Sequence, residues 1–180
     1  MRFLALTHLL EIITSVAHPE EIVVLGSSSL LTVDPKLGDP GQPLEFSYDA
    51  DLLLKPIDQS LASVLAEAVG EDSLFANRHS YYAHFLTPSI AETLPPGWHE
   101  RLGAVPPFEN ARALNPYDLA LVKLTLGRPK DLDLLRALLS RQLINAERLR
   151  EHYQTISLNE ADAAKIGRNI RTLLTSERRG

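Results

Sequence analysis

The sequence predicts an α/β fold of the α+β type, with a small mixed sheet and flanking helices in its first half and a helical second half. Two runs predict the sheet: the β-branched run EIVVLG at 21–26, and SYDADLLLKP at 47–56. The helical half follows from amphipathic periodicity in four stretches that begin at residue 114. We expect a core at 1–113 and a helical region at 114–180, packed on it as a single globular unit.

Composition excludes several classes of protein. The chain has 180 residues and no cysteine, which rules out disulfides and thiol catalysis, so any metal must use oxygen or imidazole ligands. The net charge of -5 argues against a whole-surface attraction to nucleic acid, although arginines cluster in the last 45 residues. No run is long and apolar enough for a membrane-spanning helix. Because Thr7, His8 and Glu11 interrupt the N-terminal apolar run, we expect a mature amphipathic helix and a cytoplasmic protein.

The first half is predicted to start with a helix at 2–17, which Pro19 stops. The strand at 21–26 ends in Gly26, and a short helix is predicted to follow with Ser27 as its N-cap. The Pro- and Gly-rich stretch 34–42 is predicted to be a loop.

After the second strand, DQSLASVLAEAVG (58–70) predicts a helix that has Asp58 or Ser60 near its start and Gly70 at its end. Residues 79–91 are ambiguous between strand and helix, and LPPGW (94–98) predicts a rigid turn.

Helix boundaries in the second half carry clear signals. Asn115 as N-cap and Pro116 at the first helical position predict a helix that Gly127 closes, and Pro129 opens the next one. Two further helices are predicted, at about 145–155 and 159–174, and the second is capped by Asn159 and Asp162.

The chemistry is concentrated in the second strand. Asp49 and Asp51 are two residues apart, so they point to one face of a strand. Adjacent carboxylates repel each other, and a divalent cation such as Mg²⁺ resolves the repulsion while taking its other ligands from water and phosphate. The turn at Gly26 and Ser27 would offer backbone N–H groups and a helix dipole to a phosphate. Together these features outline a nucleoside triphosphate site.

These motifs resemble those of the nucleotidyltransferase superfamily, the fold of DNA polymerase beta, whose signature is a Gly-Ser turn followed by a strand with Asp-x-Asp. Two further segments, LPPGWHERL (94–102) and LNPYDLALVKLTLGRPKDLDLLRALL (114–139), resemble uncharacterised bacterial nucleotidyltransferase-like proteins related to the AbiEii toxins of toxin–antitoxin systems. The resemblance covers roughly residues 20 to 145.

The resemblance implies a role for each matching residue. Gly26, Ser27 and Ser28 would bind the nucleotide, and Asp49 and Asp51 would hold Mg²⁺ or Mn²⁺. Lys123 would neutralise phosphate charge or organise the site, and Asp131 would be the acidic residue of the last motif. The implied reaction transfers a nucleotide from a nucleoside triphosphate to an RNA, tRNA or protein acceptor, in a protein that has a cognate antitoxin as a partner.

The chain departs from the superfamily pattern in two places. The segment 28–48 separates Ser27 from Asp49, about twice the usual spacing, so the loop at 34–45 is an insertion. Active members also take a third carboxylate from a neighbouring strand, and the sequence does not show where it is. The available acidic residues are Glu71, Asp72, Glu92 and Glu109. A catalytically silent member that binds a nucleotide or a partner protein is therefore the alternative function.

Each candidate residue also has a purely structural interpretation. The two aspartates could be surface charges of a helical interaction protein. Asp118 and Asp131 each follow a helix-opening proline by two residues, where a carboxylate favours the helix dipole, and Lys123 could be a surface side chain. Packing is the structural interpretation of the aromatic and histidine residues. These rings are those of His79, Tyr81, Tyr82, His84 and Trp98. For the C-terminal arginines, the structural interpretation is a helix face exposed to solvent.

Overall fold

The computed structural model describes residues 1–56 and 59–177, which belong to two compact units. The first unit comprises Met1–Ile90 and Leu102–Leu114, and the second comprises Ala91–Arg101 and Asn115–Gly180. The possible cap Asp58 lies outside the described residues.

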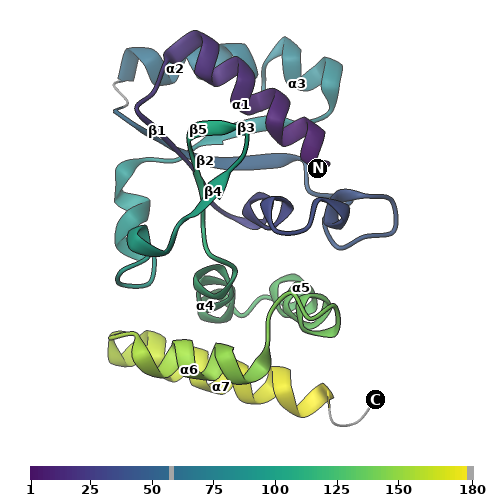
Figure 1. The fold of residues 1–180 in the computed structure, drawn as a ribbon, viewed down its shortest axis with the longest axis vertical. Coiled ribbons are helices and arrows are strands. Elements are labelled where there is room, and N and C mark those ends of the chain that lie inside the picture. Colours follow the sequence, from purple (N-terminus) through teal and green to yellow (C-terminus); the bar gives the residue numbers. More distant parts are fainter. Residues whose placement is uncertain (57–58, 178–180) are drawn as a thin grey trace. The chain divides into compact units, whose positions relative to one another are not determined.

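A mixed sheet forms the centre of the first unit (Figure 1). Within the described residues it has five strands, in the order β3-β2-β1-β5-β4. β2 pairs antiparallel with β1 and parallel with β3, while β5 pairs parallel with β1 and antiparallel with β4. The strands are β1 (Glu21–Val24), β2 (Asp49–Lys55), β3 (Tyr82–Phe85), β4 (Gly103–Val105) and β5 (Phe108–Ala113). The predicted α+β fold class is confirmed.

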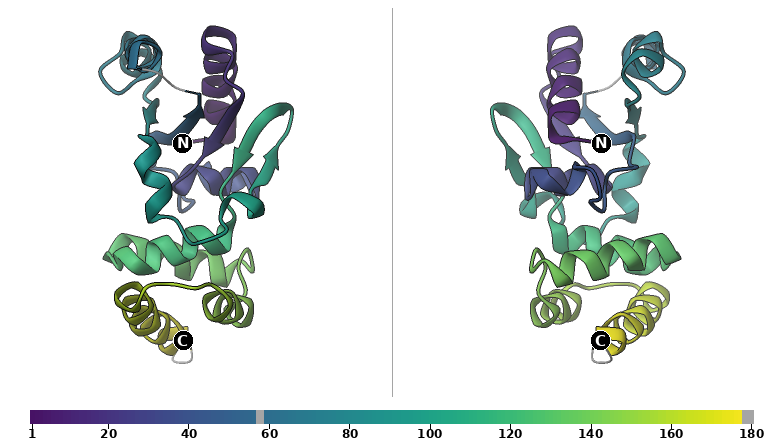
Figure 2. Two further views of the ribbon diagram at one scale, coloured as in Figure 1. Left: turned by 90° about the vertical axis from the view of Figure 1, so that its left-hand side faces the viewer. Right: turned by 90° about the vertical axis from the view of Figure 1, so that its right-hand side faces the viewer.

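Helices and 3₁₀ turns cover the two faces of this sheet (Figures 1 and 2). On one face lie α1 (Phe3–Ala17), α2 (Gln59–Val69) and the short α3 (Leu74–His79). On the other lie the 3₁₀ turns η1 (Ser27–Thr32) and η2 (Pro35–Gly38). The predicted N-terminal helix is confirmed, and its buried stripe repeats at helical spacing through Leu6, Leu9, Leu10 and Ile13.

Two strands of the sheet were not predicted. Both β4 and β5 have weak strand propensity, and β5 has the sequence FENARA, in which Phe108 is the only residue of a type enriched in strands. β5 is a strand because it lies between β1 and β4, where its backbone completes both ladders. The ambiguous stretch 79–91 divides into β3 and part of the 3₁₀ turn η3 (Pro88–Thr93).

The second unit is helical, as predicted. It contains the 3₁₀ turn η4 (His99–Arg101) and the helices α4 (Pro116–Leu126), α5 (Pro129–Ser140), α6 (Ala146–Thr155) and α7 (Glu160–Glu177). The Asn115 side chain accepts a hydrogen bond of 2.9 Å from the Tyr117 backbone N–H, which confirms the predicted cap of α4. Gly127 ends α4 with a φ of 62°. Among the described residues no helix has the length and apolar character needed to cross a membrane.

Candidate active site

The turn after β1 is built around Gly26. Its φ of 57° and ψ of -161° fall in a region that essentially only glycine adopts. Gly26 occupies the N-cap position of η1, so the prediction that Ser27 is the N-cap is wrong. The element is a 3₁₀ turn of six residues, not an α-helix, and its dipole is correspondingly short. Any phosphate contact here depends on backbone N–H groups of the turn.

The two aspartates lie on one face of β2, as the alternation predicted. Both are half-buried, while Ala50 and Leu52, which point to the opposite face, are buried. Asp49 is opposite Tyr82 of β3 in the strand register, and Asp51 is opposite His84.

Gly26 and Asp51 converge in space. A Cβ atom added to Gly26 would lie 2.2 Å from Oδ2 of Asp51, closer than side-chain carbons approach other atoms. The backbones are also joined, because the Leu25 N–H donates a 2.8 Å hydrogen bond to the Asp51 carbonyl. The glycine therefore leaves the space into which the carboxylate extends.

β3 places a histidine, His84, opposite Asp51, at a position where a carboxylate could have been the third metal ligand. His84 Nδ1 lies 2.9 Å from Oδ1 of Asp51, and the two side chains are 60% and 29% exposed. Among residues 1–56 and 59–177, no three His, Asp or Glu side chains are arranged to hold a metal ion. A metal at this site would thus take two carboxylates from the protein and its other ligands from substrate and water.

One of the four candidate carboxylates approaches this face. Burial raises the pKa of Tyr82, and so do the charge of Glu71, a hydrogen bond to it, and the charges of Asp49 and Asp51. Glu71 follows α2 and therefore reaches Tyr82 from outside the sheet. Of the other three candidates, Asp72 lies between α2 and α3, Glu92 in η3 and Glu109 in β5, and all three are exposed.

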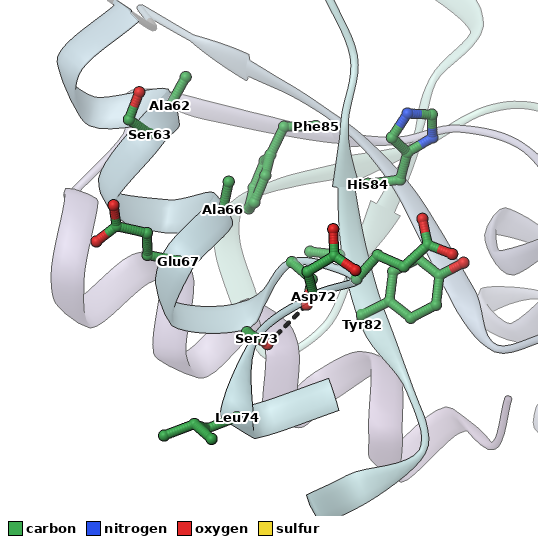
Figure 3. Close-up of a pocket in the computed structure, with 13 residues that line it drawn as sticks. Ala62, Ser63, Ala66, Glu67, Asp72, Ser73, Leu74, Tyr82, His84 and Phe85 are labelled. Carbon is green, nitrogen blue, oxygen red and sulfur yellow. Dashed lines mark hydrogen bonds between the residues drawn. The ribbon is translucent and has the colours of Figure 1, made fainter. Parts of the chain in front are cut away.

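A hollow of about 740 Å³ borders the same strand (Figure 3). It is lined by α2, by the turn that contains Glu71 and by β3. In Figure 3, Phe85 points toward Ala66 of α2, whereas His84 and Tyr82 point away from that helix. Because Tyr82 and His84 are opposite Asp49 and Asp51 in the strand register, their side chains lie on the same face of the sheet as the aspartates.

The serines of the turn differ in exposure. Ser27 is half-buried, whereas Ser28 is buried and its hydroxyl donates a 3.2 Å hydrogen bond to the Leu25 carbonyl. The Ser28 hydroxyl therefore stabilises the turn from the inside. Its predicted nucleotide contact stays a prediction, and would have to use the backbone N–H.

The remaining two predicted site residues pair with each other in the second unit. Lys123 Nζ of α4 lies 2.9 Å from Oδ1 of Asp131 at the start of α5, and their side chains are 12% and 1% exposed. Arg128 Nε donates a 2.5 Å hydrogen bond to the other oxygen of Asp131. Burial favours a raised pKa for Asp131, but the hydrogen bonds from Arg128 and Lys123 outweigh it and the pKa is lowered. The interpretation of Lys123 as a surface side chain is therefore wrong.

Sequence reasoning missed a second buried carboxylate in this unit. Asp118 is fully buried and accepts hydrogen bonds from Arg101 Nε at 2.9 Å and from His152 Nε2 at 2.8 Å. The favourable position of Asp118 near the N-terminus of α4 therefore explains only part of its stabilisation. One signal was available in the sequence, since helical spacing places Asp118 on the same stripe as Leu121. The ion pairs join α4 to α6 and to η4.

The protein family to which the chain is similar is consistent with this site, in which a glycine turn lies beside an Asp-x-Asp strand. The model of one protein family matches residues 1–173, and that family is described as a nucleotidyltransferase of unknown function, DUF6036. The chain belongs to this family. The nucleotidyltransferase superfamily is thereby supported, and the relation to AbiEii toxins rests on the sequence resemblance alone. No significant match was found among the curated proteins or among the solved structures.

Proposed function

We propose that this nucleotidyltransferase transfers a nucleotide, with the help of a divalent metal, from a nucleoside triphosphate to a hydroxyl group of an RNA or protein acceptor. The acceptor oxygen forms a bond to the α-phosphorus, and the bond from that phosphorus to the bridging oxygen breaks. Pyrophosphate leaves, and the hydroxyl proton is released. The proposal needs no covalent enzyme intermediate.

The contact between Gly26 and Asp51 carries this proposal. The contact places a carboxylate against the start of the turn. The first hydrogen bond inside the turn runs from the Ser29 N–H to the Gly26 carbonyl, at 3.3 Å. The N–H groups of Ser27 and Ser28 come before it, so they are available to a ligand. Asp49 and Asp51 present oxygen ligands on one face, which is the donor chemistry that Mg²⁺ and Mn²⁺ prefer. When bound, the ion would neutralise the charge that develops on the transferring phosphoryl group.

The backbone of the turn and the carboxylates of β2 would then have separate roles in binding. The backbone of Gly26, Ser27 and Ser28 would bind phosphate oxygens, and the aspartates would position them through the metal. Lys123 lies in the second unit, where it pairs with Asp131, and its role in offsetting phosphate charge stays a prediction from the sequence.

A second candidate function rests on His84. An imidazole, in place of a carboxylate, occupies the position opposite Asp51, and it already pairs with that residue. A protein that binds nucleotide without transferring it would tolerate this replacement. Nucleotide-induced thermal stabilisation without transfer would support this alternative.

Label transfer decides between the two functions. The protein is incubated with α-labelled nucleoside triphosphates, Mg²⁺ or Mn²⁺, and total RNA or protein. We expect labelled RNA or protein from the wild type and none from Asp51→Asn. Asp133→Asn is the matched control, because Asp133 is 72% exposed and pairs only locally, with Arg136. Equal labelling by wild type and Asp51→Asn would overturn the proposed role of the carboxylate.

The resemblance to AbiEii toxins extends the proposal to a toxin–antitoxin role in the cytoplasm. Controlled expression of the wild type in a bacterial host is expected to arrest growth, whereas Asp51→Asn is expected not to. A neighbouring gene product that relieves the arrest would be the antitoxin. Normal growth with the wild type at full expression would contradict this role.

A further inference from the structure

β3 is an edge strand of the sheet. Among the described residues, β2 pairs with one side of β3 and no strand pairs with the other. The Tyr82 and Leu86 N–H groups donate hydrogen bonds of 3.0 and 2.8 Å to carbonyl groups on the β2 side. Successive residues of a strand direct their backbone groups to opposite sides, so the N–H and C=O groups of Ala83 and Phe85 point away from β2. These groups can pair with another chain.

The two edges of the sheet differ in their protection. The edge strand β4 has only three residues, and its register is irregular between Ala104 and Val105. Short strands and bulges protect an edge against pairing, and so do Lys and Pro side chains on it. β3 has the sequence YAHF, without Lys or Pro, and it pairs with β2 in a regular register. β3 is therefore the edge that is open to a further strand.

A groove lies beside this open edge, between β3 and α2 (Figure 3). It is the hollow of about 740 Å³ described above. Ala62 and Ala66 of α2 and Gly70 at its end line the groove at intervals of four residues, so they lie on one helical face. Small side chains on that face leave space for a peptide backbone. Phe85 and the 87% exposed Leu74 also line the groove and offer apolar contacts to a bound segment.

The charge of the groove is negative. Glu67, Glu71 and Asp72 line it and are exposed, and none of its described lining residues is Lys or Arg. Such a groove attracts a cationic segment and repels a nucleic acid. A second copy of this chain that paired through its own β3 would bring the same three carboxylates to the interface, where like charges repel. Charge complementarity therefore favours a basic peptide as the occupant.

We propose that β3 and the groove bind an extended segment of a partner protein, rich in Lys or Arg, as an additional strand of the sheet. Backbone hydrogen bonds to Ala83 and Phe85 supply affinity, and the acidic side chains of the groove select for basic residues. The inference goes beyond the proposed function, because Gly26, Asp49 and Asp51 take no part in it.

Binding of a synthetic peptide to the full chain tests the proposal. The probe is a fluorescein-labelled octapeptide in which Lys alternates with Val, and the matched peptide has Glu in place of Lys. We expect fluorescence anisotropy to show binding of the Lys peptide, with an affinity that falls as salt is added, and no binding of the Glu peptide. Glu67→Lys should weaken binding of the Lys peptide by about fivefold, because repulsion replaces an exposed ion pair. Glu151→Lys, which changes an exposed residue of the second unit, should bind it as the wild type does.

N-methylated peptides separate strand pairing from simple charge attraction. Methylation of every Val nitrogen, or of every Lys nitrogen, removes the N–H groups from one edge of the peptide strand. One of these two peptides should lose binding and the other should keep it, because only one edge faces β3. Hydrogen exchange locates the contact. The amide protons of Ala83 and Phe85 should exchange more slowly when the peptide is bound, whereas that of Tyr82, already bonded to Tyr48, should not change.

Several results would overturn the proposal. They are equal affinity for the Lys and Glu peptides, equal affinity for the two methylated peptides, and unchanged exchange of the Ala83 and Phe85 amides. A dimer in which these amides are protected without any peptide would show that a second copy occupies the edge, and would overturn it too. Asp51→Asn should bind the peptide as the wild type does while it loses label transfer, so failure of peptide binding and failure of the proposed reaction are distinguishable.

Discussion

Gly26 lies so close to Asp51 that a single added carbon would meet the carboxylate, with 2.2 Å between the new Cβ and Oδ2. The two residues are 25 positions apart in a chain of 180 residues: Gly26 lies in the turn after β1, and Asp51 lies in β2. Their contact joins the turn that would bind phosphate to the strand that would bind the metal.

Gly26→Ala is therefore expected to harm both stability and activity. The Gly-only backbone conformation costs about 1 to 3 kcal/mol for alanine, and the contact with Asp51 adds to this cost. Urea unfolding measures the loss of stability, and label transfer measures the loss of activity. Gly41→Ala is the matched control, because Gly41 also has a positive φ, of 76°, but no atom lies within 4 Å of its added Cβ. Similar losses of activity in both variants would contradict a specific role for the contact.

His84→Asp is expected to raise the affinity for Mg²⁺, because it places a third carboxylate opposite Asp51. His84→Ala should not raise it, since alanine offers no ligand. Isothermal titration calorimetry with MgCl₂ compares the two variants with the wild type. His99→Asp controls for added negative charge in general. Unchanged Mg²⁺ affinity in His84→Asp would show that position 84 does not face the metal.

Asp131→Asn is expected to destabilise the protein by about 3 kcal/mol, because it leaves the ammonium group of Lys123, whose side chain is only 12% exposed, without a compensating charge. Lys123→Met combined with Asp131→Leu should recover part of this loss, since an apolar pair carries no unpaired charge. Urea unfolding of the three proteins measures both effects. A double variant less stable than Asp131→Asn would show that the pair is worth more than its replacement by apolar packing.

Asp118 makes the second unit sensitive to acid. Burial favours a raised pKa for Asp118, but hydrogen bonds from His152 and Arg101 outweigh it, and the pKa in the folded protein is lowered. Because the pKa is lower in the folded state, this carboxylate contributes stability above the unfolded value of about 3.9, and that contribution is lost as the pH falls through the folded pKa.

Fluorescence of Trp98 can follow this loss, because Arg101 joins Asp118 to the Pro96 carbonyl, two residues before Trp98. Unfolding curves of wild type and Asp118→Asn should differ at pH 7 and converge as the pH falls below about 4. A difference that stays constant over this range would show that Asp118 does not titrate differently in the two states.

Local sequence signals were sufficient to predict most helix boundaries in the second half and the orientation of the two aspartates in the first half. Asn115 and Pro116 start α4 and Gly127 ends it, because caps and breakers act within a few residues. Alternation along a strand was enough to place Asp49 and Asp51 on one face.

The sequence by itself determined the fold class, most of the helix boundaries and the placing of Asp49 and Asp51 on one face of a strand, since these follow from propensity, periodicity and local hydrogen bonds. Only the tertiary structure decided that β5 lies beside β1, that His84 faces Asp51 and that Asp118 receives Arg101 and His152. Each of these contacts joins residues at least 17 positions apart, and depends on how the chain folds back on itself and not on its local pattern.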